Sequence, residues 1–257
     1  MKKQRVLRES ESKIIQIRDR NRKRKKNRRI AFGVILLLIG VMLALLLLPC
    51  FEIKYIDTVG NEKVTHALLT EKSTVVYGEN IFKVNIKKGK KQILQIPYVE
   101  TVKIKRQLPN IVFIEIEERK PIGALPAGEG FALIDKECRI LETVPERTVP
   151  LIEGLDVKIV EGEYLNNQVS EFVANFKKLT QLLSNKTIKD RITNYIVDKN
   201  GNITFVIDGG KSVILGEEKN IEYKLLLLEA AVNELPPTQR GTIDLSEEGK
   251  ALFSPEE

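Results

Sequence analysis

Three patterns of hydrophobic and polar residues follow one another along the chain. Residues 30–48 carry no polar side chain at all. From residue 51 to residue 119, alternating stretches and helical periods come in the order strand, helix, helix, strand, strand. Beyond Pro121, short strand-like stretches are interrupted by two longer helical periods. This succession predicts an α+β protein behind a long apolar segment.

The apolar segment has the length of a membrane-spanning helix. At about 1.5 Å per residue, residues 30–48 would reach across the hydrocarbon layer of a bilayer. Residues 1–29 hold 14 Lys and Arg against three acids, and basic flanks stay on the cytoplasmic side. We therefore predict a cytoplasmic tail over residues 1–29, a transmembrane helix over residues 30–48, and an extracytoplasmic remainder. The protein would be a single-pass protein of the cell membrane.

Two other interpretations of this end of the chain stay open. A cleaved secretory or lipoprotein signal is disfavoured, because Pro49, Cys50 and Phe51 follow the apolar run where small residues are needed. The basic tract over residues 20–29 could contact nucleic acid or anionic lipid. Its place beside the apolar run favours a topological role. After residue 48 the chain has 28 basic and 32 acidic residues, which gives no nucleic-acid footprint.

The clearest element after the apolar segment is a hairpin of residues 98–106 with residues 111–118. Opposed residues share a face, so Ile104 should lie opposite Ile114 and Val102 opposite Ile116. The same register places Lys103 opposite Glu115. Two helices are predicted before it, over residues 64–71 with Thr65 as the N-cap and over residues 87–96.

The region after Pro121 is predicted to contain several strands and two helices. A hairpin joins residues 130–135 to residues 138–142, and Asn200-Gly201 gives a strong two-residue hairpin signal. A helix is expected around residues 169–179, and a second over residues 219–235. The apolar face of the first consists of Val169, Phe172, Val173, Phe176 and Leu179. The chain then ends with two strand-like segments, 241–245 and 250–253.

Several short motifs follow one another in a characteristic order: Ile56-x-x-Val-Gly-Asn61, Gly78-x-Asn-Ile-Phe82, Pro97-x-Val99, Ile114-x-Ile-Glu-Glu-Arg-Lys-Pro121 and Val149-Pro-Leu-Ile-Glu-Gly154. Together they resemble the bacterial cell division family FtsQ/DivIB, in which the last motif matches a linker pattern. The resemblance implies a POTRA domain over residues 51–120, a mixed β domain with two helices over residues 121–253, and a short tail, 254–257. Family members usually have glycine where Cys138 stands, which implies a different turn or a left-handed cysteine here.

The sequence offers little for catalysis. His66 is the one histidine of the chain, which excludes the usual zinc sites and Ser-His-Asp arrangements. Cys138 has no histidine nearby to activate it. Ser10-x-x-Lys13 has the spacing found in penicillin-recognising enzymes, but it lies on the predicted cytoplasmic side. We therefore predict no enzymatic activity, no cofactor, no metal site and no small-molecule substrate.

The last strand-like segments are the candidate partner-binding site. No later segment is available to cover them, so their edge could accept a strand from another protein. The alternative is that Ile243, Leu245 and Phe253 only fill the core. Relatives with the better-known form of this surface follow Asp-Leu with an arginine and an aromatic residue, where this chain has Ser246 and Glu247. The candidate residues are Ile243, Asp244, Leu245, Ala251, Leu252 and Phe253.

The resemblance implies a scaffold for cell division. Such a protein would recruit FtsB/DivIC-like and FtsL-like bitopic partners, collect at the division septum, and help regulate septal peptidoglycan synthesis. A different class of function is a membrane-anchored envelope-assembly or secretion factor that binds extended clients through its POTRA module. A wall hydrolase or transferase would need catalytic residues that the sequence does not offer.

Overall fold

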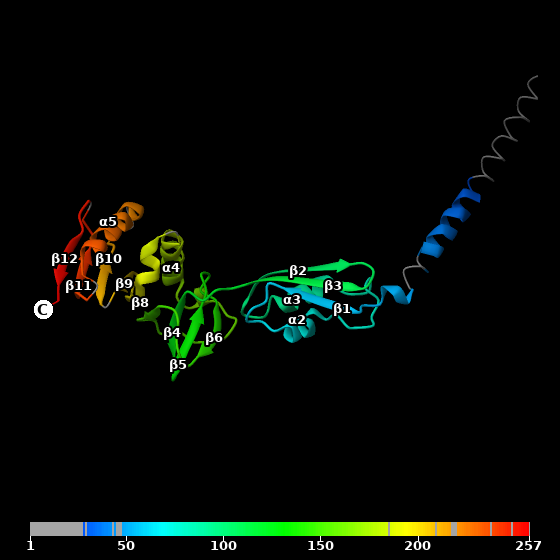
Figure 1. The fold of residues 1–257 in the computed structure, drawn as a ribbon, viewed down its shortest axis with the longest axis horizontal. Coiled ribbons are helices and arrows are strands. Elements are labelled where there is room, and N and C mark those ends of the chain that lie inside the picture. The colour runs from blue at the N-terminus through cyan, green and yellow to red at the C-terminus, as the bar shows by residue number, and fades with distance from the viewer. Residues whose placement is uncertain are drawn as a thin grey trace, which may run out of the picture. The chain divides into compact units, whose positions relative to one another are not determined.

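The computed structural model describes residues 28, 30–42, 44, 48–184, 186–208, 210–216, 220–236, 238–247 and 249–256. Strands in these residues form two sheets, one of three strands and one of nine (Figure 1). Helices accompany both sheets, so the predicted α+β class is confirmed. Residues 58–73, 86–104 and 114–257 belong to one compact unit, and every contact of the candidate sites below lies within it.

The apolar segment is described only in part. Residues 30–42 are helical and exposed. No helix within the described residues is both long enough and apolar enough to cross a membrane. The predicted cytoplasmic tail lies outside the described residues, apart from Arg28.

The first sheet has the order β1-β3-β2. Lys103 Nζ lies 3.8 Å from Glu115 Oε1, and Thr101 donates a hydrogen bond of 2.9 Å to Glu117. These contacts confirm the predicted hairpin pairing, with the aliphatic row buried and the charged row exposed. The strands are β1 (Tyr55–Val59), β2 (Val99–Gln107) and β3 (Ile111–Glu118).

Two short helices cover the apolar face of this sheet, as predicted. They are α2 (His66–Ser73) and α3 (Ile86–Ile93). Leu69 and Ile93 are fully buried. The Thr65 hydroxyl accepts a hydrogen bond from Leu68 N (3.3 Å), so Thr65 has its expected capping role. The second helix ends three residues earlier than predicted, and two turn-like hydrogen bonds carry the chain on to Ile96.

The second sheet has the order β12-β11-β10-β9-β8-β7-β4-β5-β6. Most neighbours are antiparallel, but β4 with β7, β7 with β8, and β10 with β11 are parallel. The strands are β4 (Gly123–Ala127), β5 (Gly130–Ile134), β6 (Ile140–Val144), β7 (Leu151–Glu153), β8 (Ile192–Val197), β9 (Ile203–Ile207), β10 (Lys211–Ile214), β11 (Gly241–Asp244) and β12 (Leu252–Pro255).

Two long helices pack against the second sheet and share one hydrophobic core with it. Helix α4 (Ser170–Leu183) buries Phe172, Val173, Phe176, Leu179 and Leu183, four of which belong to the apolar face read from the sequence. Helix α5 (Ile221–Glu234) buries Leu225, Leu228 and Val232. Short 3-10 turns complete the chain at η1 (Pro49–Phe51), η2 (Leu165–Asn167) and η3 (Thr187–Arg191).

The hairpin between β8 and β9 differs from its prediction in the turn. Asp198 N donates to Asn202 O (3.0 Å), so three residues rather than two form the loop. Gly201 has a φ of 77°, the left-handed position that closes a three-residue hairpin loop. Asp198 Oδ1 also accepts hydrogen bonds from Asn200 N and Asn202 N. This carboxylate stabilises the longer turn, and the Asn-Gly signal did not reveal it.

Strand β7 stands where the sequence suggested a linker. Its three residues pair in parallel with β8, and Leu151 also pairs with Ala124 of β4. A strand this short carries almost no periodicity of its own, so its neighbours decide its structure. Near the other end of this sheet, Cys138 has a φ of 57°, which confirms the left-handed alternative.

Candidate partner-binding edge

The C-terminal strand β12 is the outermost strand of the nine-stranded sheet (Figure 1). It pairs antiparallel with β11, and β11 pairs in parallel with β10. Parallel neighbours need a crossover connection, which α5 supplies between β10 and β11. The described residues therefore leave the outer side of β12 without a strand partner.

The six candidate residues divide into buried and accessible positions. Ile243 and Leu245 are fully buried, so of the two open alternatives the structure supports the core role for their side chains. Ala251 and Phe253 are partly buried against the same core. The Phe253 ring lies so close to Gly241 that a Cβ there would come within 2.8 Å of it. Leu252 is 50% exposed.

The exposed candidates lie on the sheet face that α4 and α5 do not cover. Asp244 is opposite Leu252 on the antiparallel pair and beside Ile214 on the parallel pair, so the three share a face. Ile214 is 38% exposed. Ile196 on β8 is 42% exposed and pairs with Thr204. We call Ile196, Ile214 and Leu252 the outer apolar row.

Sequence reasoning missed Ile214 and Ile196 as candidate contact residues. Ile214 stands in the run Val213-Ile214-Leu215, which has no alternation to tell its inner from its outer side. Only the register of β10 against β11 assigns it to the outer face. For Ile196, alternation with the buried Tyr195 and Val197 was an available signal.

The carboxylate of Asp244 accepts a hydrogen bond from the turn that follows it. Its Oδ1 accepts a hydrogen bond of 2.8 Å from Ser246 N. Hydrogen bonds from the side chain and the backbone of Ser246 hold the pKa of Asp244 below its ordinary value. Ser246, which departs from the better-known family pattern, therefore fixes the chain between β11 and β12.

The backbone N–H and C=O groups of β12 alternate between the side of β11 and the open side. Glu256 N donates to Arg240 O (3.2 Å), so Glu256 faces β11. Because these groups alternate along an antiparallel pair, Ser254 and Leu252 also face β11, and Phe253 and Pro255 face the open side. Proline has no N–H, so within β12 the outward N–H is that of Phe253.

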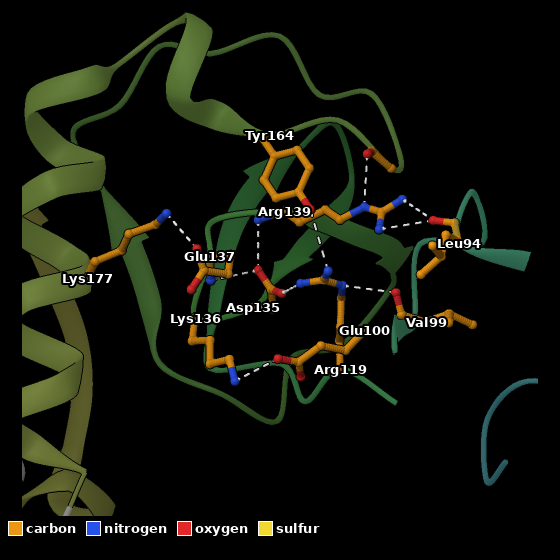
Figure 2. A network of polar contacts seen from close by, with 11 residues as sticks. Leu94, Val99, Glu100, Arg119, Asp135, Lys136, Glu137, Arg139, Tyr164 and Lys177 are labelled. Atoms are coloured by element: carbon orange, nitrogen blue, oxygen red, sulfur yellow. Dashed lines mark hydrogen bonds and ion pairs between the residues drawn. The ribbon is translucent and has the colours of Figure 1, made fainter. Parts of the chain in front are cut away.

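A second cluster of polar contacts joins the end of β3 to the turn between β5 and β6 (Figure 2). Arg119 donates to Asp135 Oδ2 (2.5 Å) and to Val99 O (3.2 Å). Asp135 Oδ1 accepts from Glu137 N (2.9 Å) and Arg139 N (2.8 Å). Arg119 is 9% exposed and Asp135 is 1% exposed, so this is a buried ion pair. It fixes the chain where the first sheet leads into the second.

Arg139 extends the cluster to the turn after α3 and to the loop before η2. Its guanidinium donates to Gly162 O (3.0 Å) and makes longer contacts with Leu94 O and Gln95 O. Arg139 also lies over the Tyr164 ring, with 5.5 Å between the guanidinium carbon and the ring centroid. The sequence contained these residues but gave no sign of their pairing, since they come from distant segments.

Glu142 on β6 is contacted by two residues that lie just outside the first sheet in sequence, Tyr98 before β2 and Lys63 before α2. Tyr98 donates a hydrogen bond of 2.5 Å to Glu142 Oε1, and Lys63 Nζ donates to the same atom (2.9 Å). Burial alone would raise the pKa of Glu142, but these two bonds and the charge of Lys63 outweigh it and hold the pKa below its ordinary value. Burial and the contact with Glu142 raise the pKa of Tyr98.

We expect Glu142→Gln to destabilise the chain by about 1 kcal/mol at neutral pH, because the ionised acceptor is lost. A depressed pKa in the folded state stabilises above the pKa of the unfolded chain and loses its effect as the pH falls through the folded value. The difference between the two chains should therefore shrink below about pH 4.5. Urea unfolding at several pH values measures it. An equal difference at pH 7 and pH 3 would contradict this role for Glu142.

His66 and Cys138 lie in different surroundings, and Ser10 and Lys13 lie outside the described residues. His66 Nδ1 is 3.0 Å from Thr58 Oγ1 on an exposed surface. Cys138 is fully buried, and burial raises the pKa of its thiol to about 12, whereas Cys50 is exposed. Within the described residues there is no group of three or more His, Cys, Asp or Glu side chains that could hold a metal ion.

Known proteins resemble the chain over most of its length. The family model described as "POTRA domain, FtsQ-type" matches residues 51–119, and "Cell division protein FtsQ/DivIB, C-terminal" matches residues 124–246. The chain is 30% identical to cell division protein DivIB of Clostridium botulinum (strain Hall) over 242 residues, 90% of this chain and 93% of that protein.

Two further relatives have related names. DivIB of Clostridium acetobutylicum is 29% identical over 216 residues, which are 80% of this chain and 84% of that protein. Cell division protein FtsQ of Corynebacterium glutamicum is 29% identical over 135 residues, 51% of this chain and 60% of that protein. Strand β12 begins after residue 246, so it lies outside the matched C-terminal range.

Proposed function

The chain belongs to the FtsQ/DivIB family of cell division proteins, and from that premise we propose that it is a non-enzymatic scaffold of the division machinery. Its extracytoplasmic part would bind FtsB/DivIC-like and FtsL-like bitopic partners at the septum. Through them it would help regulate septal peptidoglycan synthesis. The observation that carries the partner-binding part is the open edge of β12.

Strand addition to β12 is the proposed binding mode. An edge strand offers main-chain donors and acceptors to an extended segment of a partner. Here Phe253 presents its N–H and C=O outward, while its ring stays against the core and helps to hold β12 on β11. The Leu252 side chain, half exposed beside this edge, would give the partner an apolar contact.

Of the six candidate residues, we propose that Leu252 and Phe253 make the direct contacts. Ile243 and Leu245 would support the site from the core, and a charged residue at Ile243 would test folding rather than binding. Asp244 would hold the turn before β12 through Ser246, and Ala251 would lie at the start of the edge.

The anchor and topology belong to the proposal as well. The apolar run over residues 30–48 and the basic flank before it favour a single-pass anchor with the N-terminus in the cytoplasm. Such an anchor would keep both domains outside the membrane, where bitopic partners present their own exported segments.

Co-purification from native membranes tests the scaffold role. The full-length chain would be compared with a chain ending at Lys250, which loses β12 but keeps the buried Ile243 and Leu245. We expect FtsB/DivIC-like and FtsL-like proteins to accompany the full-length chain and to be lost from the shortened one. Thermal melting controls for folding of the shortened chain. Recovery of diverse exported proteins without division proteins would instead support the envelope-assembly alternative.

A further inference from the structure

A broad groove opens on the nine-stranded sheet near β4, β7 and β8, far along the strand order from β12. It is formed by residues 120–122 before β4, residues 136–137 after β5, the segment 147–150 before β7, the second half of α4 with Ser184, η3, and the start of β8. Its volume is about 1230 Å³. All its lining residues belong to one compact unit of the chain. We call it the basic groove, because its lining includes Lys120, Lys136, Arg147, Lys177 and Lys189.

The basic groove has an excess of positive side chains, whereas the chain after residue 48 as a whole has an excess of acids. The lining acids are Glu137 and Asp190, so cations outnumber acids. After residue 48, by contrast, the chain has 28 basic and 32 acidic residues. A concave surface that gathers one sign of charge concentrates ligands of the opposite sign.

Several of these cations are held in place, while others are free to meet a ligand. Lys177 pairs with Glu137 (2.6 Å) and Lys136 pairs with Glu100 (2.8 Å), as Figure 2 shows. Arg147 donates to Val149 O and Thr193 O, which ties the segment before β7 to β8. Lys120 and Lys189 are exposed, and no ion pair within the described residues engages either of them.

We propose that the basic groove is a second docking site, which binds an acidic peptide segment of another protein. Lys120 and Lys189 would meet carboxylates of that segment. Lys136, Arg147 and Lys177, already positioned by their own contacts, would add to the positive potential. The site is separate from the β12 edge, so the proposal goes beyond the scaffold function argued above.

The lining favours a peptide over an anionic polymer of sugar or glycerol phosphates. Half-buried Ile122, Val149 and Pro150 lie among the cations and would contact apolar side chains. A hydrated phosphate polymer would leave these apolar contacts unused. Hydroxyl and amide groups of Thr180 and Gln181 on α4 and of Ser184 just after it complete a surface of the mixed kind that binds peptides.

Peptide binding to the full-length chain tests the proposal. The probe is a fluorescent peptide of glutamate, leucine and serine, and the comparison peptide has glutamine in place of each glutamate. We expect the double variant Lys120→Glu with Lys189→Glu to weaken binding of the acidic peptide by about tenfold. The double variant Lys158→Glu with Lys199→Glu changes the net charge equally at exposed positions outside the groove, and it should stay near wild type.

Two further measurements locate the binding. Hydrogen exchange should show protection over residues 147–150 and 180–184 when the acidic peptide binds. The basic residues 1–29 attract acidic peptides in every variant alike, so they cancel in the comparison. Phe253→Pro, which alters the β12 edge, should bind the acidic peptide as wild type does, and this separates the groove from the proposed scaffold site.

The outcomes decide the proposal. Equal weakening in both double variants, equal binding of the glutamine peptide, or absence of protection in the groove would overturn it. Inorganic polyphosphate is the competing probe. If polyphosphate protects the same segments and displaces the acidic peptide at a lower concentration, an anionic polymer replaces the peptide as the ligand.

Discussion

Replacing Arg119 with methionine is expected to destabilise the folded chain by about 3–5 kcal/mol, since it leaves a buried charge without its partner. Asp135 is 1% exposed and keeps hydrogen bonds from Glu137 N and Arg139 N, but it loses the guanidinium at 2.5 Å. Val99 O loses a donor as well. Urea unfolding of the purified full-length chain, followed by circular dichroism, measures the loss.

The matched control is an exposed ion pair in the same hairpin. Lys103 and Glu115 are 3.8 Å apart, and their side chains are 56% and 36% exposed. Lys103→Met should therefore cost less than about 1 kcal/mol. Similar losses for Lys103→Met and Arg119→Met would show that burial does not strengthen the Arg119 contact.

A double variant separates the charge from the packing. Adding Asp135→Asn to Arg119→Met removes the unpaired carboxylate while an amide oxygen remains to accept from Glu137 N and Arg139 N. We expect the double variant to recover a large part of the lost stability, because the cost of a buried unpaired charge disappears. No recovery would mean that loss of the Arg119 side chain's other contacts causes the damage.

The sequence was most informative for elements that have one buried face and one solvent-exposed face. Apolar and polar residues alternate along β2 and β3, and opposed residues must share a face of the sheet. This alternation supported the register that places Lys103 opposite Glu115, and in the same register Thr101 lies opposite Glu117. Helix α4 showed its buried face for the same reason. In such half-buried elements apolar residues face the core and polar residues face water, so the sequence shows the period of the helix or strand.

The features that sequence reasoning missed depend on segments that meet only in the fold. Strand β7 has three residues and exists because β4 and β8 flank it. Asn200-Gly201 indicated a two-residue loop, but hydrogen bonds from Asn200 N and Asn202 N to Asp198 stabilise a three-residue loop. Arg119 follows β3 and Asp135 follows β5, so their ion pair forms only when both segments are folded. No spacing along the sequence predicts this pair.

The sequence predicted a last strand near residues 250–253, and β12 is the outermost strand of its sheet within the described residues. Alternation could not say whether Ile243 faced a partner or the core, because both positions favour an apolar residue. In the fold β11 is paired on both sides, by β10 and by β12, and the side chain of Ile243 is fully buried in the core, so the edge belongs to β12.

Phe253→Pro is expected to weaken binding of the proposed FtsB/DivIC-like partner by about a hundredfold, since it removes the outward N–H of β12 and places a ring in the path of an added strand. The β11–β12 ladder should survive, because Phe253 N faces away from β11. Affinity between the purified full-length chain and the partner from the same bacterium, by isothermal titration calorimetry, gives the result.

Phe253→Ala is the control that makes this result specific to the main chain. Both variants lose the ring that packs on Gly241, but only the alanine variant keeps the outward N–H. If strand addition is the binding mode, the alanine variant should bind much more tightly than the proline variant at equal thermal stability. Equal affinities would instead assign binding to side chains such as the outer apolar row. Because Pro255 already interrupts the donors of β12, Phe253 is the position where a single N–H can decide between these two modes.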